Sequence, residues 1–287
     1  MFIGITTKQS LKDPQHIVRK SVAYLRKHKV KVDLCPNTCR LVANQKPGLD
    51  FHNSYDLIIV FGGDGSLLRT VQQMRNFDTA LLSINMGRLG FFSDGLAKDF
   101  RKILDKVIGH DYVLESRMML RCTVMRGERR AFTQRALNEI TIARDALARM
   151  IRLKTTVDDL IVSTYVADGL VIATPTGSTG YSLSAGGPIV SPVLDSVILT
   201  PISPHSFTQK PIVIPPSSRI KVHISTSEDR VFLTMDGQTG FHLKDNDLVK
   251  IKRSTKRIKL VRLSKSSYFH VLREKLNWGL DLEGRRG

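Results

Sequence analysis

A glycine-rich turn that contains one carboxylate is the part of this chain best suited to chemistry. Residues 62–65 read Gly-Gly-Asp-Gly, between the apolar run Leu57–Phe61 and a segment whose apolar residues recur at helical spacing. The run is rich in β-branched residues, which indicates a strand buried on both faces. Backbone N–H groups at such a strand–turn–helix junction can approach an anion. A carboxylate there repels phosphate unless it binds a metal or accepts a proton, so Asp64 is a candidate catalytic residue.

The turn admits two interpretations. Asp64 is either the N-cap of the following helix or part of a site for a phosphorylated substrate. The turn lacks the G-x-x-x-x-G-K-[ST] pattern of a P-loop and the third glycine of G-x-G-x-x-G. Three glycines around one Asp are rare at average glycine usage, which favours the phosphate site but leaves the reaction open.

A second segment, residues 167–188, combines hydroxyl side chains with glycines and reads ADGLVIATPTGSTGYSLSAGGP. Such a segment can hydrogen-bond sugar hydroxyls, amides and base edges, and Tyr181 in its midst can stack on a base. The alternative is a solvated Ser/Gly linker. Apolar strands flank the segment, and Pro175 and Pro188 stiffen it, so binding is the favoured interpretation.

The charge balance favours anionic partners. Lys and Arg number 44 against 26 Asp and Glu, for a formal net charge of +18 over 287 residues. Nucleic acid and a polyphosphate metabolite both fit this charge. Aromatic residues are only 7%, and no stretch interleaves them with basic residues as a single-strand platform would. We therefore expect no nucleic-acid partner.

The compartment expected from the sequence is the cytoplasm. No apolar run approaches the roughly 20 residues of a membrane span. Residues 1–5 read as the start of a strand, without the basic and apolar regions of a signal peptide. The three cysteines form no metal-binding pattern, and their odd number argues against a disulfide framework.

Strands and helices alternate in the first 115 residues. Strands are expected at 1–7, 30–34, 57–61 and 80–84, and helices follow the first, third and fourth of these, the last over about 97–109. Residues 36–55 are expected to form a loop with at most a short helix. This alternation predicts an α/β domain with a parallel sheet and sites at the C-terminal ends of its strands.

From about residue 115 short alternating segments predict a mostly-β domain. They are expected at 118–126, 132–142, 150–157, 160–166, 170–174, 219–225, 230–235 and 247–252. A C-terminal helix that carries Phe269, Leu272 and Leu276 is expected to pack back on the first domain. The predicted division is therefore 1–115 for the α/β phosphate domain, 116–265 for the β-rich dinucleotide domain, and 266–287 for the C-terminal helix and tail.

Taken together, these blocks closely resemble the NAD kinase family. The matching blocks are GGDG at 62–65, NMGRLGFF at 85–92, LNE at 137–139, ADGLVIATPTGSTGYSLSAGGPI at 167–189, PHS at 204–206, DGQ at 236–238 and SYFHVLREKLNWG at 267–279. GGDG alone is also similar to turns of phosphofructokinases and diacylglycerol-type lipid kinases. The combination of GGDG, NE and the long hydroxyl-rich block is far more specific.

The resemblance implies transfer of the γ-phosphoryl group of ATP to the 2′-hydroxyl of the adenosine ribose of NAD. It makes Asp64 the candidate general base and implies a divalent cation, Mg²⁺, with ATP or polyphosphate as donor. The family's other binding positions match Gly65, Arg69, Asn138, Glu139, Arg149, Val166, Asp168, Thr179, Gly180, Tyr181, Ser182, Leu183, Ser184 and Gln238. It also implies a homo-oligomer, a dimer or a tetramer. Phosphoryl transfer needs positioning and charge neutralisation, and these residue types supply both.

Two positions depart from the family pattern. Many relatives carry Arg two residues before the Asp-Gly that matches Asp168-Gly169, where this chain has Val166. The residue before the loop tyrosine is usually Ala and is Gly180 here. Both positions concern dinucleotide specificity, and Val166 in particular the discrimination between NAD and NADH.

Three other function classes compete with this one. A lipid or sugar kinase with the same turn has no use for the adenosine-binding loop. A non-enzymatic nucleic-acid-binding module fits the charge of +18 and would show steep salt dependence on DNA. A dehydrogenase is disfavoured, because the third glycine and the acidic residue after a second strand are missing.

Overall fold

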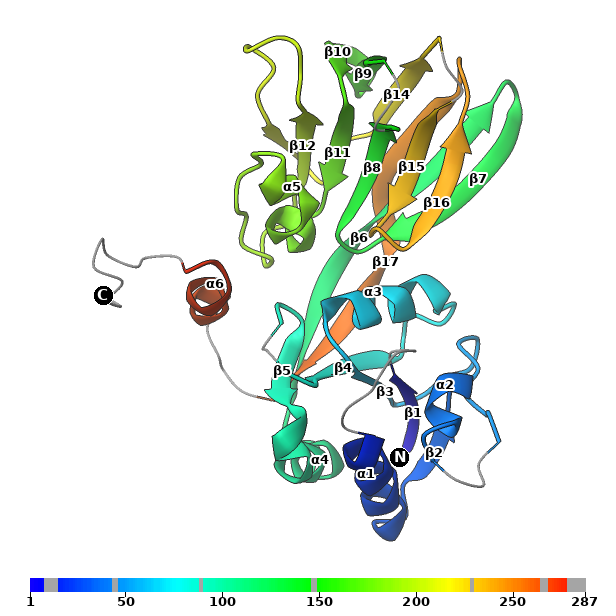
Figure 1. Cartoon of the computed structure of the whole chain (residues 1–287), viewed down its shortest axis with the longest axis vertical. Helices are drawn as coiled ribbons and strands as arrows, with labels where there is room; N and C mark the ends of the chain where they lie inside the picture. The colour runs from blue at the N-terminus through cyan, green and yellow to red at the C-terminus, as the bar shows by residue number, and fades with distance from the viewer. Residues whose placement is uncertain are drawn as a thin grey trace. The chain divides into compact units, whose positions relative to one another are not determined.

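The chain folds into two compact units in the computed structural model, which describes residues 1–7, 15–42, 46–87, 90–145, 149–227, 230–263 and 268–277. Unit 1 comprises Met1–Ser116 together with Ile258–Gly287, and unit 2 comprises Arg117–Arg257 (Figure 1). Two long strands, β6 (Val113–Arg126) and β17 (Leu248–Arg262), have residues in both units. The units are described separately below.

The sheet of unit 1 is parallel, as the alternation of strands and helices predicted. Its order is β2 (Lys31–Leu34), β1 (Phe2–Thr7), β3 (Leu57–Phe61) and β4 (Ala80–Asn85), which pairs with β5 (Ser93–Leu96) and with the end of β17. Every residue of β3 and β4 is buried. This burial explains why both strands read as continuous apolar runs rather than alternating ones.

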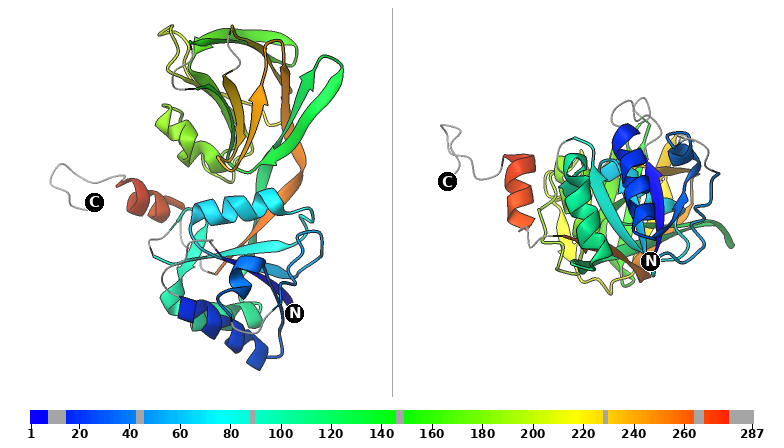
Figure 2. Two further views of the ribbon diagram at one scale, coloured as in Figure 1. Left: turned by 45° about the vertical axis from the view of Figure 1, so that its right-hand side comes forward. Right: turned by 90° about the horizontal axis from the view of Figure 1, so that it is seen from below.

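Helices cover both faces of this sheet (Figures 1 and 2). On one side α1 (Gln15–Lys27) and α4 (Phe100–Ile108) form one core with the strands, in which Leu25 and Leu104 are fully buried. On the other side lies α3 (Asp64–Gln73), which begins directly after β3. A short helix, α2 (Pro36–Cys39), lies in the segment expected to be a loop, and η1 (Ala97–Asp99) leads into α4.

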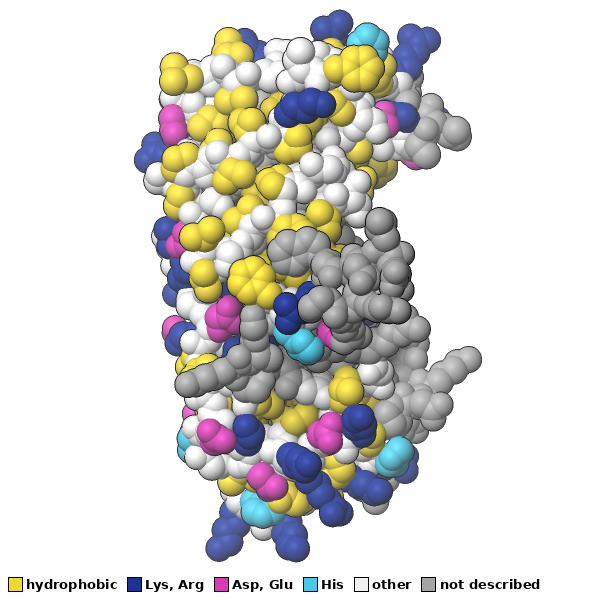
Figure 3. Space-filling view, turned by 90° about the vertical axis from the view of Figure 1, so that its left-hand side faces the viewer, with side chains coloured by type: hydrophobic (Ala, Val, Ile, Leu, Met, Phe, Trp, Pro, Cys, Tyr) yellow, Lys and Arg dark blue, Asp and Glu magenta, His cyan; other side chains and the backbone are white. Residues whose placement is uncertain are grey.

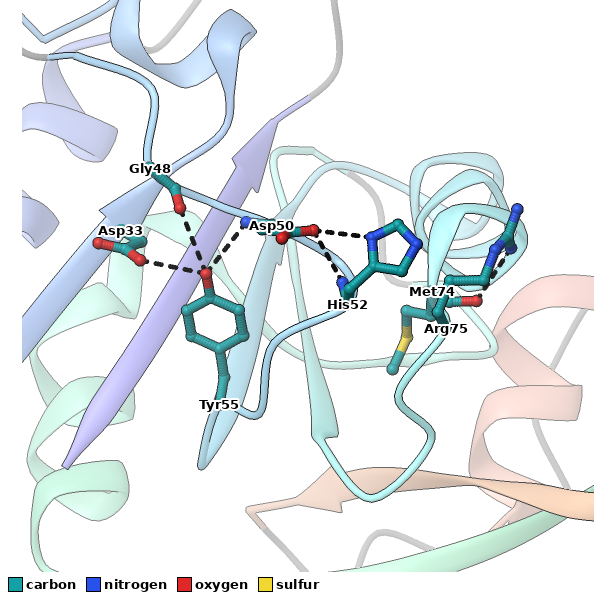
Figure 4. A network of polar contacts seen from close by, with 7 residues as sticks. All are labelled: Asp33, Gly48, Asp50, His52, Tyr55, Met74 and Arg75. Carbon is teal, nitrogen blue, oxygen red and sulfur yellow. Dashed lines mark hydrogen bonds and ion pairs between the residues drawn. The ribbon is translucent and has the colours of Figure 1, made fainter.

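A polar network fixes the loop that leads into β3 (Figure 4). The buried Tyr55 hydroxyl accepts a hydrogen bond from the backbone N–H of Asp50 at 3.1 Å and lies 3.1 Å from Asp33 Oδ2. Asp50 in turn accepts from the backbone and ring nitrogens of His52, both at 2.9 Å. The network holds the chain at the start of β3, the strand that delivers the glycine turn.

Unit 2 consists of two antiparallel sheets around one apolar core. The first contains β10 (Leu160–Ala167), β9 (Ile151–Val157), β14 (Ile220–Ser225), β17, β6 and β7 (Arg129–Ala136). The second contains β13 (Ile212–Ile214), β12 (Val197–Ile202), β11 (Gly169–Ala173), β8 (Glu139–Arg144), β15 (Val231–Met235) and β16 (Thr239–Leu243). Buried side chains of both sheets, such as Ile142, Leu170 and Val222, share the core.

Two short helices follow β11 in unit 2. They are η2 (Thr176–Thr179) and α5 (Tyr181–Ser184), and α5 packs beside β11 (Figure 1). The hydroxyl-rich segment is therefore ordered structure, and a solvated linker is the wrong interpretation of it.

The structure differs from the expected elements in three respects. The segment predicted at 132–142 is two strands, β7 and β8, because the chain turns at Leu137 and Asn138. Strands β5, β12, β13 and β16 were not predicted. β17 is 15 residues long rather than six, and its last residues pair with β4 of unit 1. Because of this pairing, unit 1 includes the chain from Ile258 onward, whereas the predicted β-rich domain continued to residue 265.

The C-terminal helix α6 (Tyr268–Leu276) belongs to unit 1, the unit on which it was expected to pack, and its Leu272 is fully buried. Residues 264–267 and 278–287, which include part of the expected C-terminal tail, lie outside the described residues. Within the described part of the chain, no helix has the length and apolar character needed to span a membrane.

Candidate active site

The Asp64 carboxylate is anchored at the start of α3 by backbone amides. Its Oδ2 accepts a hydrogen bond from the N–H of Phe91 at 3.0 Å, and its Oδ1 accepts from that of Phe92 at 3.2 Å. The N-cap of α3 is Gly63, which makes no side-chain cap, so the alternative in which Asp64 is the N-cap is wrong. Each carboxylate oxygen keeps a lone pair after these contacts, which leaves Asp64 able to accept a proton or bind a cation.

The loop that holds Asp64 is itself braced. A Cβ atom at Gly90 would lie 2.2 Å from Asp64 Oδ1, so only glycine allows this close approach. The Gly90 N–H donates to Ser93 Oγ at 2.7 Å. Arg262 lies 3.4 Å from the carbonyl oxygen of Phe92 and forms an ion pair with Glu115 at 2.6 Å. Residues 88–89 of the same block lie outside the described residues.

The first turn of α3 is open to solvent beside Asp64. Gly65 is exposed, and a Cβ atom there would meet nothing within 4 Å. A backbone of this kind at a helix N-terminus can approach a phosphate closely. Arg69, one turn further along α3, is exposed.

In unit 2, the buried Asp236 organises the segment that contains Asn138 and Glu139. Its Oδ1 accepts from the backbone N–H groups of Asn138 at 2.7 Å and Glu139 at 3.2 Å, and its Oδ2 accepts from that of Leu137 at 3.0 Å. Asp236 stands at a positive φ of 52° in the turn between β15 and β16. One carboxylate therefore fixes three consecutive residues at the start of β8.

The side chains of Asn138 and Glu139 lie next to these Asp236 contacts, and each contains an oxygen atom without a hydrogen-bond partner. Among the described residues, Asn138 Oδ1 and Glu139 Oε2 are buried without a hydrogen-bond partner. Burial is the main cause that raises the pKa of Glu139 to about 8, and the nearby charge of Asp236 adds to it. A hydrogen bond from the Tyr181 N–H partly opposes this rise in pKa. Buried oxygens without partners are expected where a polar ligand completes the site.

The raised pKa of Glu139 predicts a pH-dependent stability. Between the ordinary pKa of 4.5 and about 8 the folded protein binds more protons than the unfolded chain, so the free energy of unfolding falls as pH rises through this window. The variant Glu139→Gln stays neutral, so it should not show this fall in the free energy of unfolding, which is on the order of a few kcal/mol. We expect the stability of Glu139→Gln relative to wild type, measured by denaturant unfolding, to grow from pH 5 to pH 8. The exposed Glu128→Gln is the control, and parallel profiles for wild type and Glu139→Gln would contradict the assignment.

The hydroxyl-rich segment packs directly on the Asn138 backbone. The Thr174 N–H donates to Asn138 O at 2.8 Å, and Thr174 Oγ1 donates to Leu137 O at 2.6 Å. A Cβ atom at Gly177 would lie 2.2 Å from Asn138 O, and one at Gly180 would lie 2.9 Å from Glu139 Oε2. These glycines are required because backbone and carboxylate lie where side chains would be.

Most of the hydroxyls in this segment serve the fold rather than a ligand. Ser178 Oγ donates a hydrogen bond to Pro175 O and accepts one from the Val190 N–H, and the buried Ser182 Oγ lies 3.0 Å from Thr200 Oγ1. Ser184 and Tyr181 are exposed, whereas Thr179, Gly180 and Leu183 are partly buried. The exposed side chains are therefore the ones available to a ligand, with Tyr181 45% accessible.

Asp168 is paired within unit 2. Its Oδ1 accepts a hydrogen bond from Arg144 Nε at 2.6 Å, and its backbone carbonyl accepts from the Arg144 N–H. Val166, at the end of β10, is partly buried, and its carbonyl accepts from the His205 N–H at 2.8 Å. The cation next to Asp168 therefore comes from Arg144 on a neighbouring strand.

The predicted site residues fall into groups. Asn138, Glu139 and the Thr179–Ser184 segment lie together in unit 2. Asp64, Gly65 and Arg69 share the start of α3 in unit 1. Arg149 and Gln238 are exposed residues of unit 2.

Sequence reasoning missed the residues that hold the site in place. They are Asp236, Arg144, Thr174, Ser93 and Arg262. Asp236 and Thr174 stand in the motif blocks at 236–238 and 167–189, but neither was assigned a role in holding the site. Arg144, Thr174 and Arg262 contact residues 24, 37 and 171 positions away, so local patterns cannot reveal these contacts.

Comparison with known proteins identifies the family. Residues 11–112 match the model for the ATP-NAD kinase N-terminal domain, and residues 137–263 match that for the ATP-NAD kinase C-terminal domain. A protein from Desulforamulus reducens named NAD kinase is 36% identical over 97% of this chain and 99% of its own length. The chain belongs to the NAD kinase family. One from Moorella thermoacetica is 43% identical over 77% of this chain and 71% of its own.

Solved structures agree with this family and fold. Yeast NADH kinase, complexed with NADH, matches with a TM-score of 0.90 and 27% identity, over 98% of this chain and 89% of that one. An NAD kinase from Archaeoglobus fulgidus, in complex with ATP, matches with a TM-score of 0.73 and 28% identity, over 96% of this chain and 99% of that one. Membership of the NAD kinase family makes the protein an enzyme, a phosphotransferase, with the two-domain fold of that family. The expectations of an α/β domain followed by a mostly-β domain are confirmed.

Proposed function

We propose that this protein transfers the γ-phosphoryl group of ATP to the 2′-hydroxyl of the adenosine ribose of NAD, which gives NADP. The observation that carries the proposal is the pair of polar centres in a chain of this family. One is an amide-anchored carboxylate beside an open helix N-terminus, and the other is a buried group of unsatisfied oxygens next to an exposed Tyr. The test is incubation with ATP, Mg²⁺ and NAD, followed by detection of NADP with an NADP-specific dehydrogenase. No NADP above a no-enzyme control would overturn the proposal.

The chemical step is assigned to Asp64. Its carboxylate accepts the proton of the ribose hydroxyl as that oxygen attacks the γ-phosphorus of ATP, and ADP leaves. The open backbone at Gly65 and the positive end of α3 favour the phosphates. Arg69 and Arg149 are proposed to add positive charge.

Recognition of NAD is assigned to unit 2. Asn138 Oδ1 and Glu139 Oε2 need donors, which ribose hydroxyls and the adenine amino group supply. At pH 7 the raised pKa keeps Glu139 mostly protonated, so its carboxyl group can also donate to a ligand oxygen. Thr179–Ser184, Asp168, Val166 and Gln238 are proposed to line the rest of the dinucleotide.

A divalent cation is proposed to arrive with ATP. Mg²⁺ is commonly held by one or two carboxylates plus substrate phosphates, and the free lone pairs of Asp64 suit that arrangement. When bound, the cation neutralises charge on the phosphate oxygens. Among the described residues, no three His, Cys, Asp or Glu side chains form a cluster able to hold a metal. Polyphosphate as an alternative donor, and the cytoplasmic location, stay predictions.

Tyr181→Ala should weaken the use of NAD much more than the use of ATP. Tyr181 is exposed on α5, and its backbone N–H contacts Glu139, so α5 begins beside the unsatisfied oxygens and the ring is proposed to stack on a base there. Stacking on a base contributes about 1–3 kcal/mol, so the KM for NAD should rise roughly 5- to 150-fold. Steady-state kinetics with each substrate varied will show this, and Tyr181→Phe, which keeps the ring, is the matched control. An unchanged KM for NAD in Tyr181→Ala would remove Tyr181 from the site.

A homo-oligomer, a dimer or tetramer, is proposed from the surface of unit 2. Figure 3 shows hydrophobic side chains gathered on one face of this unit. Exposed apolar residues of the unit include Leu160, Ile161, Val193, Leu194, Phe207 and Val213, with Phe207 92% accessible. Two of them lie on β10 and one on β13, the edge strands of the two sheets. Contiguous exposed apolar surface at sheet edges is typical of an interface. Light scattering that gives only the 32.2 kDa monomer would contradict this proposal.

A further inference from the structure

A hollow lined by basic side chains lies on the first sheet of unit 2. Its volume is about 440 Å³, and four strands contribute to it: β6, β7, β14 and β17. Its lining consists of Arg121, Thr123, Arg130, Arg219, Ile220, Lys221, Lys250, Ile251 and Lys252, which we call the basic groove. Six of these nine residues are cations, and none is acidic or aromatic.

Strand register places like charges directly opposite each other in this region. Lys221 of β14 pairs with Lys250 of β17, and Arg121 of β6 pairs with Arg135 of β7. Next to the first pair, Ile220 faces Ile251, and both are buried in the core. Because successive residues of a strand point to opposite faces, the Lys pair lies on the outer face. Like charges directly opposite each other destabilise a sheet, and a bound anion would relieve that repulsion.

Only part of this positive charge is balanced within the protein. Lys221 forms an ion pair with Asp159 at 2.5 Å, and that carboxylate also feels the charge of Arg219. The side chains of Arg121, Arg130, Lys250 and Lys252 make no hydrogen bond or ion pair within the described part of the chain. The basic groove therefore keeps a strong positive potential, which favours an anion with several charges.

We propose that the basic groove binds a linear chain of inorganic phosphates at a site separate from the residues assigned to ATP and NAD. Alternate residues along a strand are about 6.6 Å apart and neighbouring strands about 4.8 Å apart, so one short anion meets several cations at once. Lys and Arg are the usual phosphate ligands. The lack of an aromatic side chain in the lining disfavours single-stranded nucleic acid, whose bases need stacking surfaces.

The test measures binding of long-chain inorganic polyphosphate by isothermal titration calorimetry. Saturating ATP is present and NAD is absent, so the donor site is occupied and no turnover occurs. The groove variant carries Arg130→Glu, Lys250→Glu and Lys252→Glu. Its matched control carries Lys210→Glu, Lys244→Glu and Lys256→Glu, three exposed residues of unit 2 outside the groove. Both variants change the net charge by the same amount, so any difference reports the location of the charges.

We expect the groove variant to bind polyphosphate at least about tenfold more weakly than wild type, with the control within about twofold. The slope of log K against log salt should fall by about 2 in the groove variant, because roughly three phosphate contacts are lost. Equal losses in both variants, or no polyphosphate binding by wild type, would overturn the proposal. Tighter binding of an oligothymidylate of matched charge would overturn the choice of ligand. NADP formation is a separate readout, so failure here is distinguishable from failure of the proposed kinase reaction.

Discussion

Replacing Asp64 with Asn should lower kcat by about 10²–10⁴-fold, while the Kd for NAD changes little. Asn keeps the size of the side chain but cannot accept the proton of the ribose hydroxyl. The ground-state hydroxyl is neutral, so the carboxylate matters most as the oxygen becomes nucleophilic. Turnover is measured with the NADP-specific dehydrogenase, and NAD binding by isothermal titration calorimetry.

Asp64→Asn also has a structural cost that must be separated from the chemical one. The Asn amide group would face the N–H of Phe91 or Phe92, and one unpaired donor costs about 1–3 kcal/mol. Assays should therefore run well below the melting temperature. Ser93→Ala is the matched control, because it removes the acceptor of the Gly90 N–H and leaves the carboxylate in place. Near-wild-type kcat in folded Asp64→Asn would remove Asp64 from the mechanism, whereas an equal loss in Ser93→Ala would show that the loss of kcat comes from the loop that holds Asp64.

Asp236→Asn should damage both stability and NAD binding. The Asp236 carboxylate accepts three backbone N–H groups, and Asn can serve the two on its oxygen but meets the third with an amide donor. With the loss of the charge, a cost of about 2–4 kcal/mol follows. This corresponds to a melting temperature lower by roughly 5–15 °C. Because the same contacts position Asn138 and Glu139, we expect the KM for NAD to rise about tenfold or more.

Two comparisons make the Asp236→Asn result specific. Asp245→Asn changes an exposed turn carboxylate that accepts one backbone N–H, and it should shift neither quantity appreciably. Asn tolerates the positive φ at position 236, so backbone strain does not explain a loss. A stable Asp236→Asn variant with an unchanged KM for NAD would show that the three hydrogen bonds of Asp236 do not position the NAD-binding side chains.

Local patterns in the sequence predicted the elements of the first unit that lead to the site. The strand Leu57–Phe61, the glycine turn and the helix after it are confirmed because one buried strand, one turn and one amphipathic helix leave strong local signals. The family and the enzyme class followed from motif blocks that keep their order along the chain. Individual strands of unit 2 were harder to predict, because an antiparallel strand with one solvent-exposed face is short and its turns are varied. β16 was missed for that reason, whereas β12 was missed although almost all of its residues are buried.

The tertiary structure alone decided how the candidate site is held. Asp64 meets Phe91 and Phe92 across 27 and 28 residues, and Asp236 reaches Leu137–Glu139 across almost 100. No periodicity encodes such contacts, because they depend on which strands become neighbours. The same applies to Glu139, whose raised pKa arises from burial and from the charge of Asp236 rather than from its sequence neighbours. The sequence therefore determined which chemical groups are present, and the strand pairing determined their environments, since burial and distance set the strength of a charge.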